Sequence, residues 1–246
     1  ASPVLQTGYA ETLGLLWLVL AIYFVMKQRY WVAVPFMALL AYTRPGMIAI
    51  ALMLAGVWLV RFIKARRGED GFPLSEKLTL INVTLIAGLL GFAWAATAWW
   101  VTGQPDAYFA TELAWRSWIG GDGKLTLLQP WFFMANFYFG TYGFIVLLGL
   151  VGFAAWLLFS KSIKKLGNEM RLWVASYFIY LLLVFLPQSS TFRILLPAFP
   201  LAAALAWRTK DTSKIQKGVI IAAGIMLQMV WLNICWYYEA PDYSPP

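Results

Sequence analysis

The chain has 246 residues, of which 61% are hydrophobic and only 12% are charged, and its net charge is +8. Soluble globular domains average about 45–50% apolar and about 25% charged residues, so this composition excludes a soluble enzyme, a disordered chain and a secreted disulfide scaffold. The chain has no histidine and a single cysteine, Cys235. It therefore offers no imidazole base, no internal disulfide and no cysteine or histidine metal cluster.

Eight apolar segments predict an all-α fold, a polytopic bundle of transmembrane helices. A transmembrane helix needs roughly 20 residues, and the segments lie at 11–26, 31–42, 46–63, 78–101, 131–159, 172–186, 194–207 and 218–237. We expect about eight spans in a single transmembrane domain that covers 1–246. The longest connection, at 102–130, is predicted to be an external loop, in which 105–118 forms a short helix along the membrane surface.

Basic residues fall on alternate connections between these segments. Fifteen of the 19 Lys and Arg residues lie at 27–29, 61–77, 161–171 and 208–217, and the other connections hold only Arg44, Arg116, Lys124 and Arg193. The positive-inside rule makes the basic side cytoplasmic, so both chain ends are expected outside. Because the chain opens with Ala-Ser-Pro and an inward-running helix, we expect it to be the C-terminal part of a larger protein.

Two external arginines, Arg44 and Arg193, are unusual because the helices beside them are short. A helix over 31–42 is about 18 Å long, against a hydrocarbon core of about 30 Å. Irregular backbone at that depth is tolerated only inside protein or along a water-filled cavity, so the loops at 43–45 and 187–193 are predicted to line an external cavity. Since the guanidinium fork suits phosphate oxygens, we predict that both arginines bind a lipid-linked phosphate. Alternatively, each snorkels or pairs with a structural carboxylate such as Glu11.

Other polar residues are candidates for substrate contacts on the same side. Tyr9 and Glu11 lie at the external mouth of the first helix, where Glu11 either bonds an acceptor hydroxyl, caps the helix or pairs internally. Gln188 and Ser189 precede Arg193 in the 187–193 loop. Asp122, within Gly-Gly-Asp-Gly at 120–123, is either a substrate contact or part of a solvated turn.

These short motifs resemble a known family. Tyr9-Ala-Glu at a helix start, followed by an apolar helix pair and Thr43-Arg44-Pro45, resembles the middle of PIG-V-like mannosyltransferases. The run from Ser189 to Arg193, ahead of Pro197 and Pro200, is similar to a later motif of the same family. These enzymes are GT-C glycosyltransferases, polytopic membrane proteins that take a sugar from a polyprenyl-phosphate donor on the external or luminal face.

The resemblance implies an activity, partners and a missing part. The chain would move a sugar, mannose or a related one, from a polyprenyl-phosphate donor to a glycolipid or glycan acceptor in cell-envelope synthesis, with membrane lipids around it. No cofactor, metal or nucleic acid is expected. The family's catalytic aspartate lies in the first external loop, and nothing in this chain matches that motif, so the catalytic residue is expected upstream or in a partner subunit.

Two other functions fit the sequence. One is a transporter or flippase for lipids or lipid-linked sugars. Against it, the chain has no repeated half with matching broken helices. The other is a noncatalytic subunit of a larger membrane complex, which would suit the absence of a catalytic motif.

Overall fold

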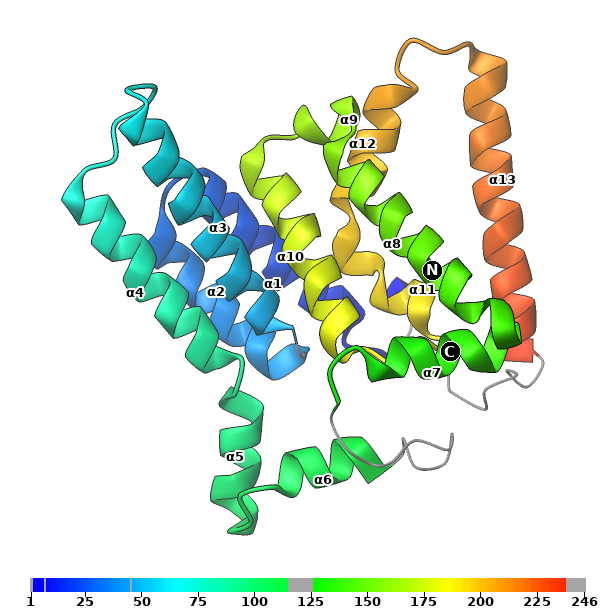
Figure 1. Ribbon diagram of the computed structural model, residues 1–246, viewed down its shortest axis with the longest axis horizontal. Coiled ribbons are helices and arrows are strands. Elements are labelled where there is room, and N and C mark those ends of the chain that lie inside the picture. Colours follow the sequence, from blue (N-terminus) through cyan, green and yellow to red (C-terminus); the bar gives the residue numbers. More distant parts are fainter. Residues whose placement is uncertain (1, 7, 45, 115–125, 238–246) are drawn as a thin grey trace.

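In the computed structural model the regular structure of the chain is helical, which confirms the all-α fold. The structure describes residues 2–6, 8–44, 46–114 and 126–237 (Figure 1). The longer helices are α1 (Glu11–Met26), α2 (Tyr30–Thr43), α3 (Met47–Arg66), α4 (Leu74–Leu90), α5 (Ala93–Thr102), α6 (Ala107–Ala114), α7 (Gln129–Phe139), α8 (Gly143–Phe159), α10 (Asn168–Val184), α12 (Pro200–Arg208) and α13 (Lys214–Leu232). Shorter helices are η1 (Ser2–Gln6), η3 (Gly140–Tyr142), α9 (Lys161–Lys164), α11 (Thr191–Ile194), η4 (Leu196–Ala198) and η5 (Asn233–Tyr237).

The hydrophobic core lies where α1, α2, α3, α4 and α10 pack together. Its centre is formed by α2 and α3, from which Met37, Ile50 and Met53 are fully buried. The buried positions of α1 recur every three or four residues, from Glu11 and Gly14 at the start to Val25 at the end, so one face of this helix packs inward along its length. That buried face is apolar except at its first turn, where Glu11 lies.

The expectation of eight spans was wrong. Among the described residues, three helices are long and apolar enough to cross a membrane, at Met47–Arg66, Gln129–Phe159 and Lys214–Cys235. A fourth is added if α4 and α5, which are bent by 44° at their junction, count as one span.

The other apolar segments are too short or are interrupted. The α1 and α2 helices have 16 and 14 residues, about 24 and 21 Å of helix. The segment predicted at 194–207 is divided into α11, η4 and α12, because Pro197 and Pro200 lack the N–H that would continue one helix.

The basic connections gather at one end of the bundle. Figure 1 shows the turn between α3 and α4, helix α9 and the turn between α12 and α13 at the upper edge, with α5, α6 and α7 at the lower edge. The α1–α2 turn belongs to the upper group, since Tyr30 just after it donates a hydrogen bond of 2.9 Å to Glu76 near the start of α4. The lower end carries the last turn of α2 and the helix α11, and therefore the two arginines of interest. Of the surface helix predicted at 105–118, α6 covers the central part, and 115–118 lies outside the described residues.

Candidate functional site

Arg44 ends α2 in a conformation that the following proline imposes. A residue before proline is disfavoured in the helical region, and Arg44 is extended, with φ −150° and ψ 137°, after its own N–H closes the last helical turn on the Leu40 carbonyl at 2.8 Å. The hydroxyl of Thr43 also bonds back to the helix, at the Leu39 carbonyl. The side chain of Arg44 is thereby directed from the end of α2 toward α1.

Arg193 lies in the four-residue helix α11, which is held against α10 by two hydrogen bonds. The hydroxyl of Tyr177 donates to the Ile194 carbonyl at 2.5 Å, and the indole N–H of Trp173 donates to the Pro197 carbonyl at 2.7 Å. Both donors are buried. These bonds fix the backbone on the C-terminal side of Arg193.

The two arginines meet on one buried carboxylate, that of Glu11. The Nη2 atom of Arg44 pairs with Oε1 of Glu11, and Nε of Arg193 lies 3.1 Å from the same oxygen. The Glu11 side chain is 4% exposed, whereas those of Arg193 and Arg44 are 13% and 28% exposed. Neither oxygen of Glu11 accepts a hydrogen bond of regular geometry from the described residues, so the two guanidiniums are what balances this buried charge.

Arg193 also lies over the aromatic ring of Tyr9, with its guanidinium carbon 4.6 Å from the ring centroid. A cation over a tyrosine face at this distance is attracted by the ring quadrupole. Tyr9, Glu11, Arg44 and Arg193 therefore form one cluster, which we call the arginine cluster. It joins the entry of α1, the end of α2 and helix α11, and it brings together four residues that the sequence singled out.

Gly14 is part of the same arrangement, and the sequence interpretation missed it. A Cβ atom at this position would lie 3.2 Å from Cγ of Arg44, closer than side chains normally pack. Because Gly14 has no side chain, Arg44 can cross α1 there. It thereby reaches Glu11, which lies about one helical turn before Gly14 on the same face of α1.

Burial governs the electrostatics of the arginine cluster. Both arginines lie outside the candidate spans. Desolvation lowers the pKa of each guanidinium, and the positive charge of Arg193 lowers the pKa of Arg44 further. An arginine still keeps its charge at neutral pH. Two guanidiniums and one carboxylate leave the cluster with one net positive charge, which suits an anionic ligand.

Two other predicted site residues, Gln188 and Ser189, lie in the turn that leads into α11. Gln188 donates its side-chain amide to Ser190 Oγ at 3.1 Å, and its own Oε1 is buried without a partner among the described residues. The carbonyl of Ser189 accepts a hydrogen bond of 3.1 Å from the indole of Trp231, which ties α13 to this turn. These contacts order the turn, and they give no evidence that Gln188 or Ser189 binds a ligand. Asp122 lies outside the described residues.

An apolar crevice adjoins the arginine cluster. It measures about 220 Å³ and opens between α3 and α10, and its lining is Ile48, Ala49, Leu52, Leu127, Ile179, Tyr180, Leu183 and Val184. Tyr180 lies near both places, because it lines the crevice, stacks on Tyr177 at 6.2 Å, and has a ring carbon 3.9 Å from where a Cβ would stand at Gly46, two residues after Arg44. A charged group and a hydrocarbon surface thus lie side by side at this end of the bundle.

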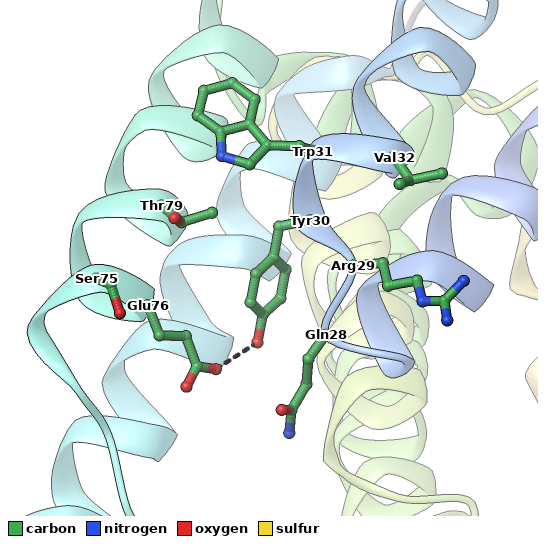
Figure 2. Close-up of a pocket in the computed structure, with 8 residues that line it drawn as sticks. All are labelled: Gln28, Arg29, Tyr30, Trp31, Val32, Ser75, Glu76 and Thr79. Atoms are coloured by element: carbon green, nitrogen blue, oxygen red, sulfur yellow. Dashed lines mark hydrogen bonds between the residues drawn. The ribbon is translucent and has the colours of Figure 1, made fainter.

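A larger pocket, of about 450 Å³, lies at the basic end between α2 and α4 (Figure 2). It is lined by Gln28, Arg29, Tyr30, Trp31, Val32, Ser75, Glu76 and Thr79. Figure 2 shows Tyr30 reaching across it to Glu76 while Arg29 points away. Glu76 is also paired with Arg61 at 3.1 Å, so its charge is already balanced. None of the predicted site residues lines this pocket.

Comparison with known proteins gives no match: no family model fits the chain, and no curated protein or solved structure is detectably similar to it. Within the described ranges, no three histidine, cysteine, aspartate or glutamate residues gather closely enough to hold a metal ion. The arginine cluster and the neighbouring apolar crevice are therefore the features from which a function is inferred.

Proposed function

We propose that this chain is part of a GT-C-type membrane glycosyltransferase that uses a polyprenyl-phosphate sugar donor, with mannose as the expected sugar. Arg44 and Arg193 bind the donor phosphate on the external face. The observation that carries the proposal is the convergence of two arginines, from separate elements, on one buried carboxylate at the end of the bundle away from the basic turns.

Burying a charged guanidinium is costly unless it is paired, and a partly buried cluster of charged groups is a candidate functional site. One nitrogen of each arginine pairs with the Glu11 carboxylate. Because a single carboxylate balances only one of the two positive charges, the cluster keeps one net positive charge for a ligand. Paired guanidiniums match phosphate oxygens in both charge and geometry. The same donors would stabilise negative charge on a departing phosphate.

The apolar crevice supports a lipid as the carrier of that phosphate. Its lining is aliphatic apart from Tyr180, and Tyr180 lies beside Gly46, two residues after Arg44. An amphiphile with a phosphate head and a hydrocarbon chain would satisfy both surfaces together, whereas a water-soluble phosphate would leave the crevice unused.

The arrangement of charge supports the orientation. The basic turns at one end would face the cytoplasm under the positive-inside rule, and the arginine cluster at the other end would face outside. In the transfer, the acceptor oxygen forms a bond to the sugar's anomeric carbon. The bond from that carbon to the phosphate oxygen breaks, its electron pair stays on the phosphate, and the acceptor proton passes to a carboxylate base, for which no residue of this chain is assigned.

The test uses the whole enzyme of which this chain is proposed to be part, in nanodiscs with radiolabelled polyprenyl-phosphate mannose, and measures both donor binding and transfer of label to membrane glycolipids. Arg193→Ala is compared with Arg61→Ala, a matched control, because Arg61 is 12% exposed and ion-paired at the basic end. We expect Arg193→Ala to lose binding and transfer while Arg61→Ala keeps both. Donor that binds equally well to the two variants would refute the assignment. Movement of intact donor between leaflets, with no transfer, would favour the flippase.

A further inference from the structure

We propose that Glu11 tunes the arginine cluster toward a phosphate with a single negative charge, and so acts as a specificity-determining residue. The inference rests on the proposed function, because it assumes that a phosphate binds at Arg44 and Arg193. It adds that the cluster discriminates a phosphodiester from a phosphomonoester, which differ by about one charge at neutral pH.

The charge balance of the cluster is the first ground. Two arginines alone would present two positive charges, and Glu11 cancels one of them through its pairing with both. A phosphodiester then makes the site neutral, whereas a phosphomonoester, at about −1.5 to −2, leaves an excess of negative charge. Excess charge in a partly buried site is costly because water does not screen it fully.

The depth of Glu11 is the second ground. Its side chain is 4% exposed, while the arginines are 13% and 28% exposed, so an anion that arrives from solvent meets the guanidiniums before the carboxylate. Glu11 also cannot readily turn away to water, because it lies in the first turn of α1, on the face that packs against the core. Its negative charge therefore stays behind the arginines and acts on the ligand through space.

The discrimination would matter for release of the lipid product. Departure of the sugar from a lipid-linked phosphodiester leaves a lipid phosphomonoester with an additional negative charge. Glu11 repels that product more than it repels the donor, so it shifts the ratio of the two affinities toward the donor. The effect follows from one charge at close range: at about 6 Å and an effective dielectric constant of about 40, it changes the binding ratio by roughly tenfold.

Two probes with the same chain test this directly: farnesyl phosphate and its methyl ester, a monoester and a diester. Their dissociation constants are measured at pH 7.5 on the protein in detergent, and the quantity of interest is the ratio of the two affinities. This ratio does not depend on the folded fraction of a variant. We expect Glu11→Gln to shift it about tenfold toward the monoester, and Glu11→Asp, which keeps the charge, to leave it near the wild-type value.

Glu76→Gln is the matched control, since Glu76 is a mostly buried carboxylate paired with an arginine at the basic end; its ratio should not change. If both probes bind through Arg193 but Glu11→Gln leaves the ratio unchanged, the role of Glu11 is refuted while the phosphate site stands. If neither probe depends on Arg193, the proposed function fails as well, and this outcome is distinct from the first.

Discussion

Filling the space at Gly14 should displace Arg44 without removing any charged group. Gly14 lies on the buried face of α1, and a Cβ there would be 3.2 Å from Cγ of Arg44. An alanine gains about 0.5–1 kcal/mol of helix stability over glycine, but here Arg44 must shift by a few tenths of an ångström while its far end is paired with Glu11. We therefore expect Gly14→Ala to leave stability nearly unchanged.

With a larger side chain at position 14, the displacement of Arg44 outweighs the gain in helix stability. Leucine at position 14 would occupy the path of Arg44, and overpacking of this kind costs about 1–3 kcal/mol. If Arg44 leaves the cluster, a phosphate ligand loses one charge-assisted hydrogen bond, worth about 1.5–3 kcal/mol, or roughly a 10- to 100-fold loss of affinity.

The control is Gly88 in α4, where an added Cβ meets nothing within 4 Å. Gly88→Ala should therefore gain helix stability, by up to about 1 kcal/mol. Thermal unfolding in detergent and the affinity for methyl farnesyl phosphate are measured for all three variants. The reasoning is refuted if Gly14→Leu unfolds and binds like Gly88→Ala.

Four further expectations follow from single contacts. Replacing Tyr9 with alanine removes the ring beneath Arg193, a contact worth about 0.5–2 kcal/mol, and should weaken binding of methyl farnesyl phosphate several-fold in a titration; an unchanged affinity would speak against the ring contact. Tyr177→Phe loses the hydrogen bond to the Ile194 carbonyl and should destabilise the protein by about 1 kcal/mol, measured by thermal unfolding, whereas no loss would mean that α11 is held by other contacts. Leu183→Trp should fill the apolar crevice and weaken a probe with a farnesyl chain but not one with a methyl group, and equal effects on the two would contradict the role of the crevice. A cysteine placed at Gly71, in the basic turn after α3 where an added Cβ meets nothing within 4 Å, and in a Cys235→Ser background, should resist an impermeant thiol reagent added outside intact cells, and rapid labelling would reverse the proposed orientation.

Composition and periodicity were sufficient to predict the fold class, because the bundle requires only apolar helices of adequate length. They overestimated the number of spans. Hydropathy treats 194–207 as one segment, although Pro197 and Pro200 divide it, and it treats 78–101 as a straight helix, although α4 and α5 are bent by 44°. In the second case, the break adjoins Gly91, where a Cβ would lie 2.8 Å from Ile48 of α3. That contact depends on tertiary packing, which local sequence does not encode.

The arginine cluster contains four residues that the sequence singled out, but the sequence did not predict how they pair, and it missed Gly14. The rarity of charge in this chain was enough to draw attention to Glu11, Arg44 and Arg193, and pairing with Glu11 was one of the alternatives left open. That both arginines would pair with Glu11 could not be derived, because α1, α2 and α11 meet only in the folded bundle. Gly14 escaped notice for the same reason, since its role is to leave room for a residue on another helix.

The measurement that tests the central claim most directly is photo-crosslinking with a lipid phosphodiester that carries a diazirine on its hydrocarbon chain, followed by mapping of the labelled peptides. Binding of the phosphate at Arg44 and Arg193 should place label in α3 and α10 around Ile48, Ile179 and Leu183, which line the crevice. The label should disappear in the Arg44→Ala/Arg193→Ala double variant and persist in Arg61→Ala. The claim that Arg44 and Arg193 bind a lipid phosphate would be contradicted if the double variant were labelled at the same residues as the wild type. It would also be contradicted if label appeared only around the pocket at the basic end.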